Sequence, residues 1–403
     1  MSVSLSKLDY LQQLGITGIY MTPIFEAPSA HKYDTIDYYK IDPDFGDQEI
    51  FRKLVEEAHR RGMKIMLDMV FNHCGALFPK WQDVLERGSN SGYYDWFMIN
   101  HWPIEKEIQN TRDGSFYSFA FESNMPKLNT NNEETASYLI NICRYWVEQF
   151  QVDGLRFDVG NEISHTFLRR VRRELKAENP DLYLLGEIWH DAGEWLRGDE
   201  YDGVMNYPLT ESINDFWVDS CLTKQEFAYM VNRSYTMYQE QNNQALFNLL
   251  DSHDTDRLFT RSGRDEDAFY QQLTILFTMP GSPCIFYGTE IAMEGGHDPD
   301  CRRCMPWDKI KKGEYNGHIR TMQQLIGLRK ENPCFTSPYF HFPSLYDNKR
   351  LIEYEKLTAD GEKVVVYLNC SEKTECLDVK DIVFSRKYEE KYLKPGGILI
   401  HRK

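Results

Sequence analysis

The sequence predicts an α/β fold: a (β/α)8-type TIM barrel whose first strand is apparently missing, with an inserted subdomain and a C-terminal antiparallel β domain. Three observations predict it. Apolar strand-like runs alternate with amphipathic helical segments along most of the chain, which is typical of a parallel sheet closed into a barrel. One connection, roughly residues 74–132, is too long for an ordinary loop. After the last barrel helix, the pattern changes to short alternating runs joined by turns.

The first half of the chain supplies the first strand and helix units. Leucines recur at helical spacing over residues 6–14 and Gly15 follows as a usual terminator, so a helix is expected there. The next segments are expected, in order, to be a strand at 16–23, a helix at 48–62, a strand at 64–72, a helix at 134–150, a strand at 152–159, a helix at 163–179 and a strand at 182–189.

The second half continues the alternation and then leaves it. The expected elements are a strand at 203–208, a helical stretch, a strand at 245–253, a helix at 267–279, a strand at 282–288, a helix at 319–333, and short strands at 350–357 and 363–369. Seven barrel strands result rather than eight, because the chain opens on a helix. We therefore expect a catalytic barrel at 1–330, with an inserted subdomain at about 74–132 over its mouth, and a C-terminal β-sandwich domain at 331–403.

Composition narrows the partners. The formal net charge of -16 argues against nucleic acid, whose phosphates require basic surfaces. No apolar run is long enough to span a bilayer, so no membrane role is expected. Neutral ligands fit better, and the 8 Trp, 25 Tyr and 23 Phe offer flat faces on which sugar rings stack, although most of them must belong to the core.

Two features predict a cytoplasmic location. The first residues, MSVSLSKLDYLQQLG, lack the charged start, apolar stretch and cleavage site of a secretory signal. The nine cysteines are odd in number and scattered, as in reduced thiols rather than a disulfide framework. Cys301 and Cys304 have redox or zinc spacing, but no second pair completes a four-ligand site.

Polar side chains gather where the expected strands end, which in such barrels is where chemistry occurs. A single carboxylate there is as often a loop cap, but several together repel one another and so indicate a function. The residues concerned are Asp68, Asn72 and His73 after one strand, Arg156 and Asp158 after the next, then Glu187, and later His253 and Asp254.

Two of these carboxyl groups fit the pair that glycoside hydrolysis needs, one ionised and one protonated. Residues two apart in a strand share a face, so Arg156 should lie beside Asp158 and keep it ionised as a nucleophile. Glu187, flanked by Ile188 and Trp189, has apolar neighbours that would favour its protonated, acidic form. Asp254 would accept hydrogen bonds from sugar hydroxyls.

These residues resemble the alpha-amylase family of glycoside hydrolases. Its motifs occur in order as DMVFNH at 68–73, GLRFDVGNE at 154–162, GEIW at 186–189 and LLDSHD at 249–254. The resemblance implies a retaining mechanism with Asp158 as nucleophile, Glu187 as acid/base and Asp254 as transition-state stabiliser. It also implies that His73, Arg156 and His253 line the subsite of the reacting glucose.

Finer marks resemble the neopullulanase, cyclomaltodextrinase and maltogenic amylase branch. They are MPKLN at 125–129, the Asn161–Glu162 pair and Trp189. The stretches at 31–42 and 295–303 are similar to others that line the glucose site. With these, the candidate substrate-binding residues are Tyr33, Asp68, Asn72, His73, Arg156, Asn161, Glu162, Trp189, His253, Asp298 and Arg302. The branch's usual amino-terminal domain is not found, so a homodimer is expected only of a longer form.

The leading hypothesis is a retaining α-glucan hydrolase, with some transglycosylation, that cleaves α-1,4 links of cyclodextrins, pullulan or maltooligosaccharides. One alternative is a catalytically impaired fragment or a carbohydrate-binding barrel without activity. Another is a metal-dependent hydrolase built on Asp68, His73, His253 and Asp254, which is disfavoured because Arg156 would lie against the cation. No cofactor is required for the chemistry. A structural calcium ion near Asn72 is left open, and no metal ligands are assigned.

Overall fold

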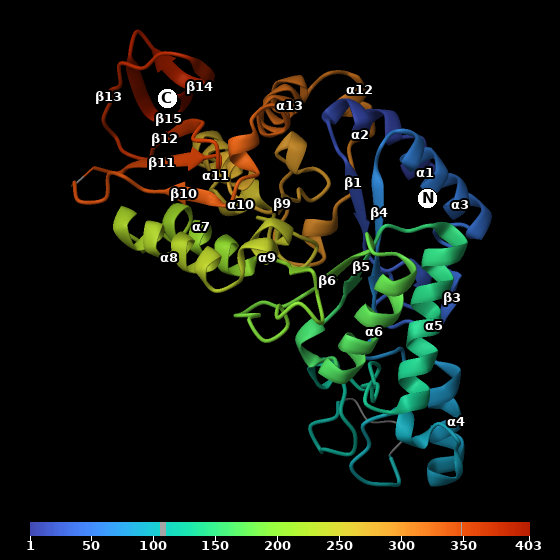
Figure 1. The fold of residues 1–403 in the computed structure, drawn as a ribbon. Coiled ribbons are helices and arrows are strands. Elements are labelled where there is room, and N and C mark those ends of the chain that lie inside the picture. The colour runs from blue at the N-terminus through green and yellow to red at the C-terminus, as the bar shows by residue number, and fades with distance from the viewer. Residues whose placement is uncertain (105–109, 348) are drawn as a thin grey trace. The chain divides into compact units, whose positions relative to one another are not determined.

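The computed structural model describes residues 1–104, 110–347 and 349–403 (Figure 1). Residues 105–109 of the predicted insertion and residue 348 of the predicted C-terminal domain lie outside this description. The chain divides into two compact units. The first comprises Met1–Ile188 and Glu194–Asp202, and the second comprises Trp189–Gly193 and Gly203–Lys403.

A parallel sheet forms the centre of the first unit, with strands in the order β1, β4, β5 and β6. All four residues of β5 are buried, as expected where helices cover a parallel sheet. The register pairs Asp68 of β4 with Arg156 of β5, and Arg156 with Leu185 of β6. The strands are β1 (Gly18–Met21), β4 (Lys64–Met69), β5 (Gly154–Phe157) and β6 (Tyr183–Gly186).

Amphipathic helices flank these strands, and Figure 1 shows α3, α5 and α6 lying alongside them. Their starts are capped by side chains: Asp47 accepts from the Ile50 amide, and Asn132 accepts from the amides of Glu134 and Thr135. Gly15 ends α2 in the left-handed region, as the sequence predicts. The helices are α1 (Ser2–Leu5), α2 (Leu8–Leu14), α3 (Gln48–Arg60), α4 (Pro79–Arg87), α5 (Glu133–Phe150) and α6 (His165–Glu178).

The long segment after β4 packs around aromatic residues of its own. Trp81 of α4 is buried against the rings of Phe97 and Phe116, with centroids 4.8 and 4.9 Å away. An antiparallel bridge between His73 and Lys127 joins the end of this segment to the residues that follow β4. A short antiparallel ribbon of β2 (Phe25–Glu26) and β3 (Asp37–Ile41) precedes α3.

The second unit combines helices with short strands. β8 (Phe247–Asn248) pairs in parallel with β9 (Ser282–Pro283), and β7 (Gly203–Val204) precedes them. Helix α11 is buried from Phe269 to Thr278 and packs against α13 and β15. The helices are α7 (Tyr207–Trp217), α8 (Lys224–Thr236), α9 (Glu240–Ala245), α10 (Leu258–Arg261), α11 (Glu266–Thr278), α12 (Trp307–Lys311) and α13 (Asn316–Glu331).

The chain ends in an antiparallel sheet, which confirms the change of pattern seen in the sequence. Its path runs β10, β11, β12, β15 and β13, with β14 paired to β15. Gly361, at a φ of 89°, lies in the turn between β11 and β12. The strands are β10 (Tyr339–His341), β11 (Leu351–Leu357), β12 (Lys363–Asn369), β13 (Glu375–Cys376), β14 (Ile382–Glu389) and β15 (Tyr392–Arg402).

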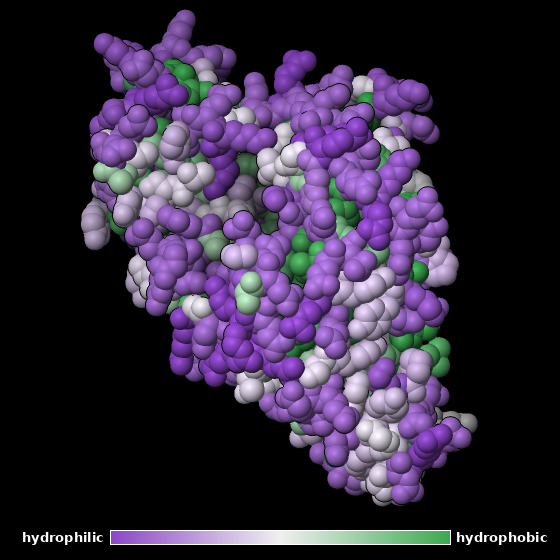
Figure 2. All heavy atoms as spheres, turned by 45° about the vertical axis from the view of Figure 1, so that its right-hand side comes forward, coloured by the Kyte–Doolittle hydropathy of each residue, from purple (hydrophilic) through white to green (hydrophobic). Residues whose placement is uncertain are grey.

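These observations confirm the α/β class, with a parallel sheet and a C-terminal antiparallel sheet. Each predicted barrel strand corresponds to a strand, although β7, β8 and β9 extend over only two residues each. The face visible in Figure 2 is largely hydrophilic, with small scattered apolar patches. Within the described residues, none of the helices is both long and apolar enough to cross a lipid bilayer.

Candidate active site

Arg156 organises a buried cluster of carboxyl groups at the carboxyl ends of β4, β5 and β6. Its Nη1 atom is 2.8 Å from both oxygens of Asp68 and 2.8 Å from Oδ1 of Asp158. Its Nη2 atom is 2.7 Å from Oε1 of Glu187. The Arg156 side chain is fully buried, and those of Asp158 and Glu187 are 9% and 8% exposed. Arg156 thus lies beside Asp158, as strand alternation predicts, and it also contacts the other two carboxyl groups.

Burial and the neighbouring charges have opposite effects on the pKa values of Asp158 and Asp68. Burial raises the pKa of the Asp158 carboxyl well above its usual value, and the Glu187 and Asp68 charges add to this rise while Arg156 opposes it. Burial raises the pKa of Asp68 as well, again against Arg156. Arg156 thus favours the ionised form of Asp158, as the sequence predicts, but burial and two neighbouring carboxyl groups oppose it, because the guanidinium is shared among three carboxyl groups.

Glu187 has a more polar setting than its sequence neighbours suggest. Its Oε2 atom accepts a hydrogen bond of 2.9 Å from the Val159 amide, and its other oxygen lies against Arg156. The expected apolar surround is thus wrong for both carboxyl oxygens. Val159 has a φ of 47°, which is unfavourable for a β-branched residue. Strained backbone of this kind persists where the surroundings fix it, often at functional sites.

Two tyrosines orient Asp68. The Tyr33 hydroxyl donates to Oδ2 at 3.1 Å, and the Tyr20 hydroxyl donates to the same atom at 2.6 Å. These bonds hold the Asp68 carboxyl in place beneath Arg156. Tyr20 was not singled out in the sequence, although its position in β1, the strand paired with β4, was a signal that could have suggested it.

His73 follows β4 and is buried, with its ring stacked on Phe119 at 4.9 Å. Burial lowers its pKa to about 3, so the imidazole is neutral at physiological pH. Among the described residues, its Nε2 atom has no hydrogen-bond partner. A buried nitrogen left in this state is suited to a ligand hydroxyl.

Lys127, inside the MPKLN stretch, is hydrogen-bonded to the side-chain oxygen of Asn72. Its ammonium group donates to Asn72 Oδ1, to the Glu162 carbonyl at 3.2 Å and to Glu162 Oε2 at 3.0 Å. Asn72 Oδ1 is thus hydrogen-bonded to an ammonium group, which disfavours a calcium ion at that oxygen. In the described part of the chain, no three His, Cys, Asp or Glu side chains are grouped to hold a metal. Asn161 is half-buried in the short 3-10 helix Gly160–Glu162, and Glu162 is exposed.

The second unit brings together four of the other predicted residues. His253 Nε2 is 3.2 Å from Asp254 Oδ2, and Arg302 Nη2 is 3.7 Å from Asp254 Oδ1. Arg302 Nε donates to the His253 carbonyl at 3.1 Å and is 2.7 Å from Asp298 Oδ1. The Asp254 side chain remains 34% exposed. Trp189, by contrast, is stacked on Tyr207 with ring centroids 3.7 Å apart.

The two groups, one in each unit, differ in their chemistry. The Arg156 cluster offers buried carboxyl groups that differ in their hydrogen bonds, which suits nucleophilic and acid–base work. The Asp254 cluster offers a partly exposed carboxylate held by a cation and an imidazole, which suits binding of hydroxyl groups.

Comparisons with known proteins agree with this chemistry. Residues 4–325 match the family described as alpha amylase, catalytic domain. The chain is 48% identical to intracellular maltogenic amylase of Bacillus subtilis over 90% of its own length and 60% of that protein. It is 48% identical to neopullulanase 2 of Thermoactinomyces vulgaris over 81% of its length and 54% of that protein. A solved structure of a cyclomaltodextrinase matches with a TM-score of 0.88 at 38% identity, covering 99% of this chain and 68% of the other. The chain thus spans about 60% of the length of the curated relatives it matches.

Proposed function

Because this chain belongs to the alpha-amylase family, in the branch of maltogenic amylases, cyclomaltodextrinases and neopullulanases, we propose that it is a retaining α-glucan hydrolase. The observation that carries the proposal is the contact of Arg156 with Asp68, Asp158 and Glu187 in one buried cluster. A simple ion pair needs one carboxylate. Three carboxyl groups around one guanidinium destabilise the fold and so indicate chemistry.

The cluster supports a two-step reaction. In the first step, Glu187 donates a proton to the glycosidic oxygen while the Asp158 carboxylate attacks the anomeric carbon, and the bond to the leaving sugar breaks. In the second step, Glu187 takes a proton from water, whose oxygen displaces Asp158 from the anomeric carbon. A sugar hydroxyl in place of water gives transglycosylation. Asp158 and Glu187 contact the two terminal nitrogens of one guanidinium, which favours the shorter carboxyl spacing of retaining enzymes.

The other residues have binding roles in this proposal. Asp68, held by Tyr20 and Tyr33, and the unpartnered His73 nitrogen bind hydroxyls of the reacting glucose. Asp254 is the third catalytic carboxylate and stabilises the positive charge that develops on the sugar ring. His253, Asp298 and Arg302 bind the sugar beside it. Asn161, Glu162 and Trp189 contact neighbouring sugar units. Asn72 acts indirectly, through Lys127.

The proposed substrates are cyclodextrins, pullulan and short maltooligosaccharides, cleaved at α-1,4 links. The similar proteins support this class, as they include a maltogenic amylase, a cyclomaltodextrinase and a neopullulanase. We further propose that the enzyme works in the cytoplasm, in line with the relative named as intracellular. The chemistry as proposed requires no cofactor, and a homodimer of a longer form stays a prediction.

Proton NMR of a digest tests the proposal directly. The chain is incubated with β-cyclodextrin or maltotriose, with Glu187→Gln as the control. A retaining enzyme releases α-anomeric sugar before mutarotation, and the control variant is silent. Initial release of the β-anomer would contradict the retaining mechanism. Absence of turnover by the unmodified chain, together with sugar binding, would favour the carbohydrate-binding alternative.

A further inference from the structure

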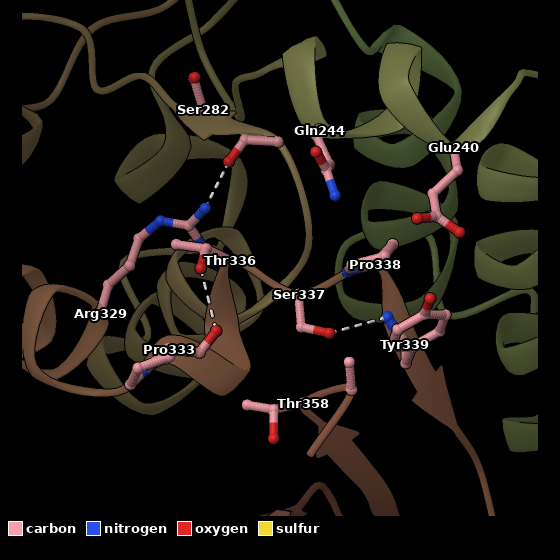
Figure 3. A pocket seen from close by; sticks show the side chains of 12 residues that line it. Glu240, Gln244, Ser282, Arg329, Pro333, Thr336, Ser337, Pro338, Tyr339 and Thr358 are labelled. Atoms are coloured by element: carbon pink, nitrogen blue, oxygen red, sulfur yellow. Dashed lines mark hydrogen bonds between the residues drawn. The ribbon is translucent and has the colours of Figure 1, made fainter. Parts of the chain in front are cut away.

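A hollow lies within the second unit, and none of the candidate catalytic residues lines it. It has a volume of about 550 Å³ and is lined by α9, β9, the residues around 333–339 and the turn after β11 (Figure 3). We call it the Tyr339 hollow. Its volume is within the range of ligand sites in proteins. None of the residues assigned above to the Arg156 and Asp254 clusters lines it.

The walls of the Tyr339 hollow carry side chains suited to a sugar. Tyr339 is 47% exposed, and Glu240 and Gln244 are exposed residues of α9. Figure 3 shows Gln244 and Glu240 extending from one side of the hollow, while Thr358 stands on the opposite side. An exposed aromatic face with amide, carboxylate and hydroxyl groups around it can stack on a sugar ring and bond its hydroxyls.

Arg329, one of the lining residues, binds the backbone on several sides. Its guanidinium donates to the carbonyl oxygens of Phe277 at 3.0 Å, Met279 at 2.9 Å and Phe335 at 2.9 Å, and also to Gly281. These bonds tie the end of α11 to the segment that leads into β10. A binding surface fixed in this way loses little freedom when a ligand arrives.

The chemistry of the lining residues also limits the ligand. Arg329 directs its terminal nitrogens to backbone carbonyls, so it does not offer a bidentate site for a phosphate or a carboxylate. Among the lining residues, Glu240 is the acidic one, so the walls do not attract an anion. A neutral ligand with many hydroxyl groups therefore fits better than a nucleotide or an acidic peptide.

We propose that the Tyr339 hollow binds a stretch of an α-glucan chain as a second site, distinct from the catalytic one. That the sugar is an α-glucan rests on the proposed function, whereas the neutral, hydroxyl-rich character of the ligand rests on the hollow itself. A site of this kind holds a long chain to the enzyme and raises the local concentration of cleavable links. A substrate that is no longer than the catalytic site has no further sugar units to place in the hollow, so it should not benefit.

Hydrogen exchange measured by mass spectrometry tests the proposal on the full chain. The Glu187→Gln variant is used so that maltohexaose is not consumed. We expect the sugar to slow amide exchange in peptides that cover 240–246 and 335–341. Adding Tyr339→Ala should abolish this protection, whereas Tyr346→Ala, at a tyrosine that is 96% exposed and outside the hollow, should leave it unchanged. Saturating maltohexaose without protection in these peptides would overturn the proposal.

Two further measurements separate this proposal from the proposed function. In the otherwise unmodified chain, Tyr339→Ala should lower kcat/KM for soluble starch by about tenfold, as for the loss of a central aromatic contact, with maltotriose hydrolysis unchanged. Equal losses of kcat/KM for soluble starch and maltotriose would overturn the proposal of a second site. If the unmodified chain shows no hydrolysis of any substrate, yet maltohexaose still protects residues 335–341 from exchange, the proposed sugar site stands and the enzyme proposal fails. Equal protection by cellohexaose would overturn the assignment to α-glucans.

Discussion

Replacing Asp158 with asparagine should raise stability while it abolishes activity. The side chain keeps its shape and an oxygen for Arg156 Nη1, which is 2.8 Å from Asp158 Oδ1, but it loses its charge. Two unit charges 4 Å apart interact by about 4 kcal/mol at an effective dielectric constant of 20. The change removes one attraction of this order, to Arg156, and two repulsions, from Asp68 and Glu187. If the three separations are similar, the two repulsions outweigh the one attraction, and fully charged groups would favour the variant by at most about 4 kcal/mol.

The realised gain is smaller, because the native cluster already relieves part of the repulsion by binding protons. Burial raises the pKa of Asp158, so the folded chain binds more protons than the unfolded chain between the ordinary carboxyl pKa and the raised one. Stability from this group is therefore present at acid pH and lost as the pH rises through that window. We expect Asp158→Asn to gain about 1–2 kcal/mol at pH 7.5 and almost nothing at pH 4.5.

Urea unfolding at the two pH values measures this difference, and the digest assay measures activity. We expect kcat to fall by at least about a thousandfold, because the nucleophile is removed. Asp181→Asn, at an exposed aspartate of the same unit, is the matched control and should change neither quantity. A loss of stability of similar size at both pH values would refute the electrostatic reasoning, even if activity is lost as expected.

Three further predictions follow from charged groups elsewhere in the chain. Lys127→Met should lower the unfolding free energy by about 1–3 kcal/mol, because three hydrogen bonds to Asn72 and Glu162 are lost. Lys53→Met, on the exposed side of α3, is the control and should have little effect. Chemical denaturation of both variants measures the difference. Treatment with EDTA should leave the melting temperature and the activity unchanged, because the Asn72 oxygen already accepts a hydrogen bond from the Lys127 ammonium group. A lower melting temperature or activity that is recovered when calcium is added would contradict this. Burial lowers the pKa of Lys356 to about 7, so between the ordinary lysine pKa and that value the folded chain binds fewer protons than the unfolded chain, and stability falls as the pH falls through this window. Lys356→Met should therefore stabilise the chain by roughly 2–4 kcal/mol at pH 6 but not at pH 10. Equal effects at both pH values in urea titrations would count against this.

Local sequence patterns predicted the type and order of the helices and strands well, but they predicted the lengths of these elements less well. Apolar periodicity located the strands and the helices, because one face or both faces of each must be buried. The short strands β8 and β9 were predicted too long, since residues such as Leu249 and Leu250 are buried in the loop that follows β8 and look strand-like in the sequence. The path of the inserted segment could not be predicted, because it depends on distant aromatic contacts such as Trp81 with Phe116.

The contacts in the candidate site were predicted from the sequence where they depend only on the alternation of side chains along one strand. Arg156 and Asp158 are two residues apart, so their contact follows from alternation. The contact of Arg156 with Glu187 depends on the register of β5 against β6, which the sequence does not specify. The role of Lys127 depends on contact with Asn72, 55 residues earlier in the chain. Such contacts between distant segments require the folded structure.

Two unfavourable features occur together after β5, which distinguishes this place from an ordinary ion pair. Asp158 is buried with two other carboxyl groups around one guanidinium, and the next residue, Val159, has a backbone conformation that β-branched residues avoid. The Val159 amide donates to Glu187, so the strained turn also fixes the third carboxyl group. Structural stability alone would favour an apolar residue at 158 and a glycine at 159. The arrangement is explained if the strain and the crowded charges position Asp158 and Glu187 for the reaction.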